Sequence, residues 1–389
     1  MYKKIIILLV CLIAGMSFLG LLKLKNNSKN NSKITIQFSS WGSESEIKIL
    51  KPILMNFEKD NPNINVDFMH IPQNYFPKIH LLFASNTAPD VIFMNNQYLP
   101  IYANAGVLED LSELKSEFCY DKFYTKSLET LSWQGKIYAV PRDISNLVVF
   151  YNKDLFRKYN VPYPKPDWTY YDFVKTAKEL THEPNVFGVS FEEEPLFYLP
   201  YLTSFGLNSL PKFEDSQTQI GLNKYANLRN KYKVAPRKED SASATMAQMF
   251  LQGKLGMQVS GRWLVPKYRE EANFDWDVVE FPKGSAGSIV PMDGSGWAIS
   301  KSSKHKKEAI ELVKYLSSKQ SSQEFTKSGL IVPARVDVAE SKVFLDGNKP
   351  KNAQVFLTEI ETSKPTVVGV NYREILDDLK TKTEYMFNK

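Results

Sequence analysis

The folded part of the chain begins with short β-rich segments that alternate with helical patterns. The expected strands are ITIQF (34–38), INVDFMHI (64–71) and PDVIFM (89–94). After the first strand, apolar residues from Ile47 to Phe57 recur at helical spacing, and Asn61-Pro62 ends that helix. Another helix is expected at about 75–86. A β-α-β-α-β order of this kind predicts parallel α/β units, in which helices cover the faces of a sheet.

A hairpin and a buried strand lead from the first α/β unit to a second one, which is marked by a later helix start. The segment WQGKIYAVP (133–141) predicts a hairpin that turns at Gln134-Gly135, and SNLVVFYN (145–152) predicts a buried strand. Thr169 and Asp172 then stand at the N-cap and N3 positions of a capping box, which predicts a helix start. Further helices are expected at about 220–232, 243–252, 262–271, 304–318, 320–328, 352–362 and 371–386.

Charge and size limit the classes of function. The chain has 389 residues, 43% of them hydrophobic and 13% aromatic, which is enough apolar material for two domains. It carries 49 basic and 43 acidic residues, and five of the lysines lie in residues 1–32, where there is no acid. The rest is therefore almost neutral. A nucleic-acid binder needs a basic surface on its folded part, so we expect no nucleic-acid partner.

Residues 1–32 predict export and attachment to the membrane. The segment 5–22 is an uncharged run of apolar and small residues that follows two lysines, and as a helix it would reach roughly 27 Å. The preferred interpretation is an uncleaved signal anchor. A lipoprotein signal at Cys11 and a cleaved signal peptide stay open, although Val10 counts against acylation. Residues 23–32 then form a flexible polar tether, which places the folded part on the outer face of the cell membrane.

The sequence offers little for catalysis. The two cysteines form no CxxC pair, and no GxSxG, HExxH or P-loop motif occurs. The four histidines have no metal-ligand spacing: His70, His80, His182 and His305. The acidic run 192–194 is explained better as a solvated loop than as a pair of catalytic carboxylates. We therefore expect no enzyme, no metal and no cofactor. A secreted carbohydrate-active enzyme and a non-transport surface binding protein are the alternatives.

Ten segments, taken in their order along the chain, resemble one family. They are 57–68, 84–94, 102–111, 135–144, 151–159, 168–173, 250–263, 275–282, 294–300 and 329–335. They are similar to segments of the family 1 extracellular solute-binding proteins, which include maltose-type carbohydrate binders. The resemblance implies a two-lobed α/β fold of the type II periplasmic-binding-protein kind, with ligand held in the cleft between the lobes. It implies a monomer that binds a sugar or oligosaccharide and delivers it to the permease subunits of an ABC importer.

The resemblance also implies how the chain is divided. Lobe 1 is expected to contain 33–142 and about 291–318, and lobe 2 to contain 143–290 and about 319–389. Ligand that bridges both lobes would stabilise a closed form, because its affinity for the closed form exceeds its affinity for the open one.

A sugar site should combine aromatic platforms with planar polar groups, because sugars present flat C–H faces and many hydroxyls. In the first half of the chain the candidates are Trp41, Asn95 and Asp143. Trp41 and Asn95 follow strands, and ligands of open α/β sheets gather beyond the carboxyl ends of strands. Each has an alternative role: Trp41 packing under the first helix, Asn95 capping the next helix, and Asp143 pairing with Arg142.

In the second half the candidates are Arg262, Trp263, Trp297 and Arg335. Trp263 follows a strand end with a glycine, which lets backbone approach a ligand. Arg262 stands where the family pattern has a small residue or proline, so it indicates either a changed subsite or a solvated side chain. Trp297 has the core of the fold as its alternative place. Arg335 would bind paired hydroxyls or a carboxylate, which keeps an acidic sugar open. Four tyrosines are grouped as reserve platforms: Tyr98, Tyr198, Tyr201 and Tyr372.

Overall fold

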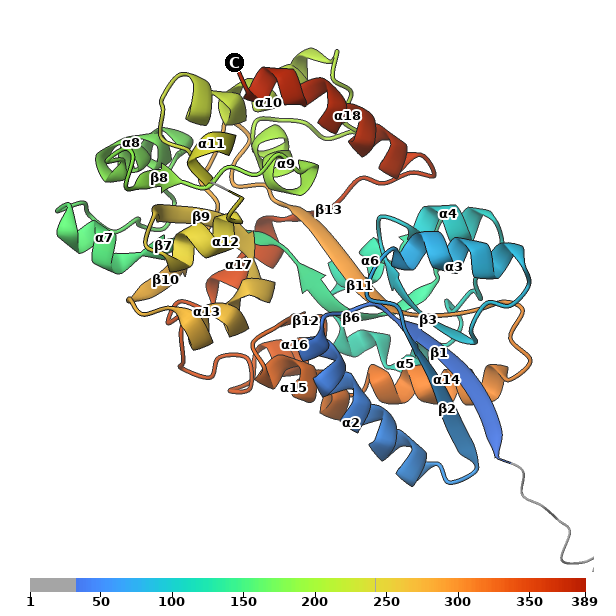
Figure 1. Ribbon diagram of the computed structural model, residues 1–389. Coiled ribbons are helices and arrows are strands. Elements are labelled where there is room, and N and C mark those ends of the chain that lie inside the picture. Colours follow the sequence, from blue (N-terminus) through green and yellow to red (C-terminus); the bar gives the residue numbers. More distant parts are fainter. Residues whose placement is uncertain (1–32, 242) are drawn as a thin grey trace, which may run out of the picture.

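The chain folds into two lobes, each built on its own β-sheet (Figure 1). The computed structural model describes residues 33–241 and 243–389. The larger sheet contains β1 (Ile34–Ser40), β2 (Ile64–His70), β3 (Val91–Asn95), β6 (Ala139–Ser145), β11 (Pro291–Ile299), β12 (Val332–Pro333) and β13 (Lys364–Pro365). The smaller sheet contains β7 (Leu147–Asn152), β8 (Phe187–Val189), β9 (Leu255–Gly261) and β10 (Trp276–Val279). A separate hairpin joins β4 (Ser132–Trp133) and β5 (Lys136–Ile137).

Helices cover both sheets. Before β7 they are α2 (Glu44–Asp60), α3 (Tyr75–Ala84), α4 (Leu99–Asn104), α5 (Lys115–Phe118), the 3₁₀ turn η1 (Tyr120–Lys122) and α6 (Thr125–Thr130). Between β7 and β11 they are α7 (Lys153–Lys158), α8 (Tyr170–Leu180), α9 (Pro195–Ser204), α10 (Ser216–Asn230), α11 (Lys238–Ser241), α12 (Met246–Leu251), η2 (Arg262–Leu264) and α13 (Val265–Glu271). The last are α14 (Lys306–Leu316), α15 (Lys319–Lys327), α16 (Val336–Ala339), α17 (Val355–Thr362) and α18 (Tyr372–Phe387).

Lobe 1 contains the predicted β-α-β-α-β run. β1 pairs in parallel with β2 and with β3, and the order across the sheet is β12-β6-β11-β3-β1-β2. The helix α2 begins where Ser43 accepts a hydrogen bond from the backbone N–H of Glu46, and it buries Ile47, Leu50 and Phe57. The carboxyl ends of β1 and β3 therefore lie side by side at one edge of the sheet.

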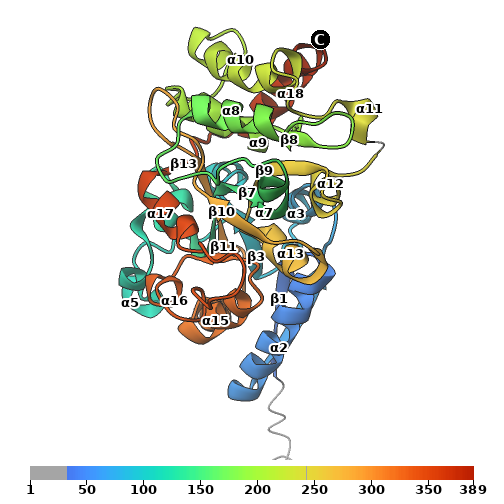
Figure 2. The same ribbon diagram turned by 90° about the vertical axis from the view of Figure 1, so that its left-hand side faces the viewer.

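Lobe 2 is the sheet β10-β7-β9-β8 with its own helices. The predicted capping box of α8 is confirmed, because Thr169 and Asp172 each accept a hydrogen bond from the other's backbone N–H. The hairpin turn at Gln134-Gly135 is confirmed as well, and both residues have positive φ. Figure 2 shows α2 at one end of the molecule, and α10 and α18 at the other.

Among the described residues, the chain passes between the lobes from β6 to β7, between β10 and β11, and between α16 and α17, and β13 then pairs with the start of β11 before α18. The strands β6 and β11 are antiparallel neighbours that run to these crossings. The backbones are close: a Cβ on Gly296 would lie 2.1 Å from the carbonyl oxygen of Val140. Any side chain at that position would push the two crossing strands apart.

The predicted division of the chain differs from the structure after residue 318. β12 pairs with β6, and α15 packs against α2, so residues 319–339 lie with lobe 1 and not with lobe 2. The segment stays with lobe 1 because β12, a strand of two residues that follows α15, completes the edge of the larger sheet. The predicted lobe 2 begins again at α17, whose Phe356 ring contacts Phe150 of the smaller sheet.

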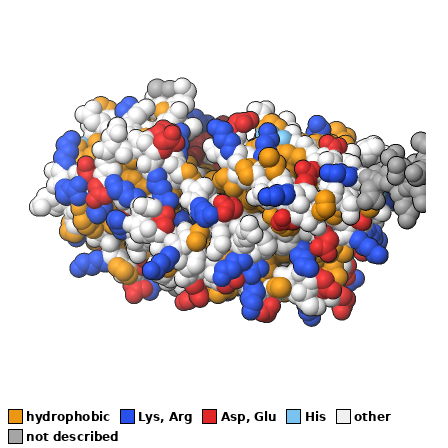
Figure 3. Space-filling view, turned by 90° about the horizontal axis from the view of Figure 1, so that it is seen from below, with side chains coloured by type: hydrophobic (Ala, Val, Ile, Leu, Met, Phe, Trp, Pro, Cys, Tyr) orange, Lys and Arg blue, Asp and Glu red, His pale blue; other side chains and the backbone are white. Residues whose placement is uncertain are grey.

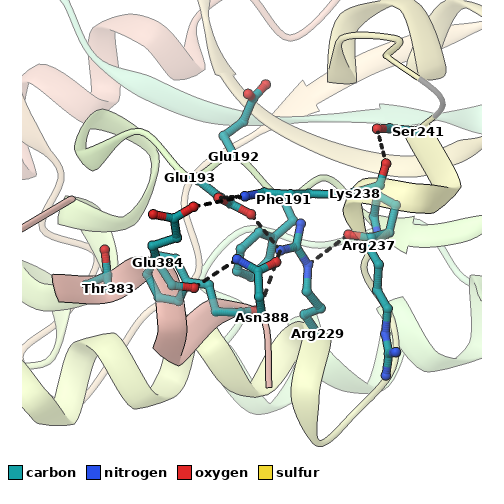
Figure 4. Close-up of polar contacts among 12 residues, drawn as sticks. Phe191, Glu192, Glu193, Arg229, Arg237, Lys238, Ser241, Thr383, Glu384 and Asn388 are labelled. Atoms are coloured by element: carbon teal, nitrogen blue, oxygen red, sulfur yellow. Dashed lines mark hydrogen bonds and ion pairs between the residues drawn. The ribbon is translucent and has the colours of Figure 1, made fainter. Parts of the chain in front are cut away.

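A buried arginine is one of the groups that hold the carboxyl end of the chain to lobe 2 (Figure 4). Arg229 of α10 pairs with Glu193 at 2.9 Å and donates to the side-chain oxygen of Asn388 at 3.1 Å. Its guanidinium carbon lies 3.9 Å from the ring centroid of Phe191. The last helix is therefore part of the lobe.

The predicted anchor, Cys11 and the tether lie outside the described residues. In the part that the structure describes, no helix combines the length and hydropathy that crossing a bilayer requires. Within the same part, no group of three or more His, Cys, Asp or Glu residues is arranged to hold a metal ion.

Candidate functional site

A cavity of about 340 Å³ lies between the two lobes. Lobe 1 and the crossing strands contribute Trp41, Glu46, Phe93, Asn95, Asn96, Gln97, Arg142, Asp143, Ile144, Ser145, Asn146, Asp293, Gly294, Ser295, Leu330, Ile331 and Val332. Lobe 2 contributes Leu196, Arg262 and Trp263. Five of the seven predicted site residues therefore lie around one cavity: Trp41, Asn95, Asp143, Arg262 and Trp263.

Two tryptophans reach this cavity from opposite lobes. Trp41 follows β1, is 48% exposed, and contacts the ring of Phe93 edge-on with 6.1 Å between centroids. Trp263 lies in η2 after β9 and is half-buried against the core of lobe 2. Its indole folds back over Gly261, where a Cβ would lie 1.9 Å from Cζ3 of the indole. Glycine at this strand end thus allows the indole to reach the cavity.

An arginine with two carboxylates forms the floor of the cavity. The guanidinium of Arg142 pairs with Glu46 at 2.5 Å and with Asp143 at 2.6 Å. Asp143 also accepts from the hydroxyl of Ser295 at 2.8 Å. Burial alone would lower the pKa of Arg142, but the two carboxylates outweigh burial and raise it above its ordinary range. The predicted alternative for Asp143, a pair with Arg142, is therefore present in the structure.

Asp293 at the start of β11 is held by neutral donors. It accepts from the side chains of Asn96 at 2.8 Å, Gln97 at 2.9 Å and Thr366 at 2.6 Å. Gln97 in turn accepts a hydrogen bond from Arg373 of α18 at 3.0 Å. This chain of hydrogen bonds connects the edge of lobe 1 with the last helix of lobe 2.

Two asparagines on the wall differ in what they bind. The side-chain oxygen of Asn95 accepts from the backbone N–H of Tyr98 at 3.1 Å, so it holds the turn before α4. The N-cap of α4 is Tyr98, which has no side-chain capping bond, so the predicted alternative role of Asn95 as a helix cap is not the arrangement found. Asn146 donates to the carbonyl of Phe356 at 2.9 Å, but its own buried oxygen has no partner among the described residues. Asn146 therefore offers an acceptor to a ligand.

Arg262 is, with Arg229, one of the buried arginines of lobe 2. Its Nε and Nη1 atoms are buried and have no hydrogen-bond partner in the described part of the chain. The guanidinium carbon lies 4.0 Å from the ring centroid of Phe344 and 5.4 Å from that of Phe356. Burial, together with repulsion by Arg269, lowers the pKa of Arg262 to about 9, and Asp346 offsets part of that effect. The side chain is thus not the solvated one that the sequence also allowed.

Trp297 was predicted to bind ligand, but it does not line the cavity. It is fully buried in lobe 1, with its ring edge-on to Phe38 and Phe93 at 5.4 and 6.0 Å between centroids. The guanidinium carbon of Arg142 lies 5.6 Å above it. Because side chains two apart share one face of a strand, Trp297 lies one layer below the cavity on the same face as Ser295. It supports Arg142 instead of touching a ligand.

Arg335 was also predicted to bind ligand, and it does not line the cavity either. Its Nε and Nη2 atoms donate to the two carboxylate oxygens of Asp337, each at 3.0 Å, and its guanidinium carbon lies 5.3 Å from the ring centroid of Phe123. A bidentate pair two residues away satisfies this arginine at the start of α16. It lies away from the cavity for that reason.

The reserve tyrosines lie elsewhere too. Tyr198 and Tyr201 are buried in lobe 2, and Tyr98 stacks on Phe76 with 3.9 Å between centroids. Tyr372 lines a second cavity of about 430 Å³ beside α9, together with mostly aliphatic and proline side chains such as Leu199. That cavity has no tryptophan in its lining and fewer polar side chains than the interlobe cavity. We therefore assign the site to the interlobe cavity.

Sequence reasoning missed several polar residues of the wall, among them Glu46, Arg142, Asn146 and Asp293. Arg142 was considered only as a partner for its neighbour. Glu46 carries no local signal, because its contact with Arg142 joins residues 96 positions apart. Position after the end of β6 was the signal available for Asn146, whereas Asp293 lies near the start of β11 and had none.

Comparison with known proteins agrees with this architecture. Residues 27–323 match the family model described as bacterial extracellular solute-binding protein. The maltodextrin-binding protein MdxE of Bacillus subtilis is 24% identical, over 88% of this chain and 82% of its own. The ABC substrate-binding protein Lmo0181 of Listeria monocytogenes, solved with cycloalternan, is 26% identical with a TM-score of 0.83, over 92% and 94% of the two chains. Maltose-bound MalE3 of T. maritima has a TM-score of 0.77 at 23% identity, over 91% and 94%.

A two-lobed α/β protein with a cavity between its lobes belongs to the class of periplasmic-binding-protein folds of type II, as predicted. This chain belongs to the bacterial extracellular solute-binding proteins, the non-catalytic binding components of ABC transporters. The predicted family and the prediction of a binding protein are thereby confirmed.

Proposed function

We propose that this protein is the extracytoplasmic component of an ABC importer that captures a sugar or oligosaccharide and delivers it to the membrane permease. The observation that carries the proposal is the pair Trp41 and Trp263, which reach one interlobe cavity from opposite lobes. Indole faces suit the C–H faces of sugar rings. The names of relatives support the same class, since MdxE binds maltodextrin and Lmo0181 was solved with cycloalternan.

Each wall residue then has a role. Trp41 and Trp263 stack on the sugar, while the free oxygen of Asn146 accepts from a hydroxyl. Asp143 and Asn95 line the cavity with part of their hydrogen-bonding capacity already used, so they fix its shape and contribute single contacts. A ligand that touches both tryptophans is bound better in the closed arrangement than in an open one, and this difference drives closure.

Closure is the signal in this mechanism. The permease subunits recognise the surface that the two closed lobes form together, and a separate subunit hydrolyses ATP. The basic and acidic side chains on the face shown in Figure 3 are interspersed, which fits docking to a protein surface better than binding to a polyanion.

Attachment to the membrane is part of the proposal. The signal anchor over residues 5–22 would keep the lobes close to the permease through the tether. Membrane fractionation of Cys11→Ala separates the alternatives, because release into the medium would mean lipid attachment. Retention at wild-type level is the result expected for a spanning segment.

The test is titration of the full-length protein in nanodiscs with a panel of neutral, acidic and phosphorylated oligosaccharides. Tryptophan emission should change on binding, because Trp41 is 48% exposed in this structure. Trp263→Ala and Trp41→Ala should each weaken binding by about tenfold or more. Tyr171→Ala, which removes an aromatic ring that is 75% exposed, is the matched control. No response to any sugar in the panel, with bond cleavage detected instead, would refute the proposal.

A further inference from the structure

The interlobe cavity is lined by five charged side chains from the described residues, and the fold pairs them unequally. Glu46 and Asp143 both bind Arg142, at 2.5 and 2.6 Å. Asp293 accepts three hydrogen bonds from neutral side chains. Arg262 makes no hydrogen bond and no ion pair with any described residue. The guanidinium of Arg262 is therefore left without an anionic partner among the described residues.

The surroundings of Arg262 hold its guanidinium in place without satisfying it. The residue is 3% exposed, and its Nε and Nη1 atoms are buried. Phe344 and Phe356 contact the planar group through their rings, at 4.0 and 5.4 Å from the ring centroids. A buried and unpaired charge is costly, and the fold offers these donors no acceptor. An acceptor has to come from the cavity that the residue lines.

The field around Arg262 favours an anion. The charged side chains that act on it are Arg269 and Asp346, which pair with each other at 3.0 Å. This cluster of two arginines and one aspartate leaves an excess of positive charge. The carboxylates of Glu46 and Asp143 are already bound to Arg142, so they do not neutralise it.

The side-chain oxygen of Asn146, an acceptor near Arg262, sets a second requirement for the ligand. The ring of Phe356 contacts Arg262, and its backbone carbonyl accepts from Asn146. The buried oxygen of Asn146 has no partner among the described residues and lines the same cavity. A ligand that satisfies both residues carries a negatively charged oxygen group and, close to it, a hydroxyl.

We propose that Arg262 binds an anionic group of the ligand, so that the substrate class is an acidic saccharide. This inference rests on the proposed function, because it names the kind of sugar that the same cavity takes. A sugar carboxylate is the group that the geometry favours: a planar guanidinium pairs well with a planar carboxylate, and uronic acids carry hydroxyls beside it. Phosphate and sulfate esters present related oxygen anions, and the test has to distinguish them.

The experiment uses full-length protein in nanodiscs and calorimetric titration. The probes are trigalacturonate, its fully methyl-esterified form, neutral maltotriose, and maltotriose that carries a 6-phosphate. We expect the acid to bind roughly tenfold to hundredfold more tightly than its ester, because hydrogen bonds to a charged group are worth that factor. Arg262→Met should remove the difference between acid and ester. Lys267→Met, which removes an exposed cation on α13, is the matched control and should keep it.

Folding of the variant is checked by its melting temperature. Arg262→Met should raise the melting temperature of the unliganded protein, because it removes an unpaired buried charge. Arg262→Lys keeps the charge and should retain part of the preference for the acid. A preference for the phosphate probe that Arg262→Met removes would assign the same site to a phosphorylated saccharide.

Two results would count against this inference. Equal binding of acid and ester, unchanged in Arg262→Met, overturns it while the proposed capture of a sugar stands. Failure of all four probes and of the wider panel to bind overturns both proposals together.

Discussion

Glu359 gives the sharpest prediction about stability. It lies on α17, is 1% exposed, and accepts a hydrogen bond from the backbone N–H of Phe281 at 2.7 Å. Its second carboxyl oxygen has no partner among the described residues. Burial is the main cause that raises the pKa of Glu359 to about 8 from an ordinary 4.5, and Glu280 adds to it. The folded protein therefore keeps Glu359 protonated at neutral pH.

The sign of the pH dependence follows from that shift. The folded state has the higher pKa, so the contribution to stability is complete below about pH 4.5 and is lost as the pH rises to about 8. The difference between these two values corresponds to an upper bound of roughly 5 kcal/mol. Glu359→Gln keeps the size of the side chain and stays neutral at every pH, so it should remove this loss.

The assay is urea unfolding of wild type and Glu359→Gln between pH 5 and pH 8.5. We expect the free energy of unfolding of the wild type to fall relative to the variant as the pH rises, with the variant the more stable of the two at pH 8.5. Glu361→Gln changes an exposed carboxylate on the same helix and serves as the control. Parallel curves for wild type and Glu359→Gln would show that the carboxyl is ionised in the folded state, and the explanation would be wrong.

Three other substitutions test the site and the lobe. Gly261→Ala places a Cβ 1.9 Å from the indole of Trp263, so sugar affinity should fall by about tenfold or more in calorimetry. Gly253→Ala has nothing within 4 Å of its Cβ and lies outside the cavity lining, so it should leave affinity unchanged, although its φ of +69° makes Ala cost some stability. Arg142→Met leaves the buried carboxylate of Asp143 and the half-buried one of Glu46 without their cation and should cost about 3–5 kcal/mol in urea unfolding. A loss below about 1 kcal/mol would contradict a stabilising role for these two ion pairs. Arg229→Met should cost about 2–4 kcal/mol by the same measurement, and fraying of α18 in hydrogen exchange should accompany it.

Local backbone rules explain why much of the fold was predictable from sequence. The capping box at Thr169 and the turn at Gln134-Gly135 depend only on neighbouring residues, and the structure has both. The β12 strand was missed because Val332–Pro333 is too short for any periodic pattern. It exists because the edge of β6 is available to pair with it.

Site residues were predictable where their position after the end of a strand decided the direction in which the side chain points. Trp41 and Trp263 follow strand ends and reach the cavity. Trp297 lies within β11, and alternation gives the face on which a side chain lies but not its depth below a cavity. Arg335 was misplaced because its pair with Asp337 depends on rotamers that sequence spacing does not fix. Apart from the neighbouring pair Arg142 and Asp143, the pairing of charges is thus a property that sequence could not supply.

The two arginines of the cavity illustrate what that missing property decides. Arg142 is surrounded by acceptors from its own fold, so removing it should damage stability first. Arg262 has no such acceptors, so removing it should raise stability and reduce selectivity for charged ligands. Local violations of the rule that buried charges are paired are typical of functional sites, because the compensating group arrives with the ligand. Opposite effects of Arg142→Met and Arg262→Met on the melting temperature would therefore separate the arginine that builds the cavity from the one that selects its ligand.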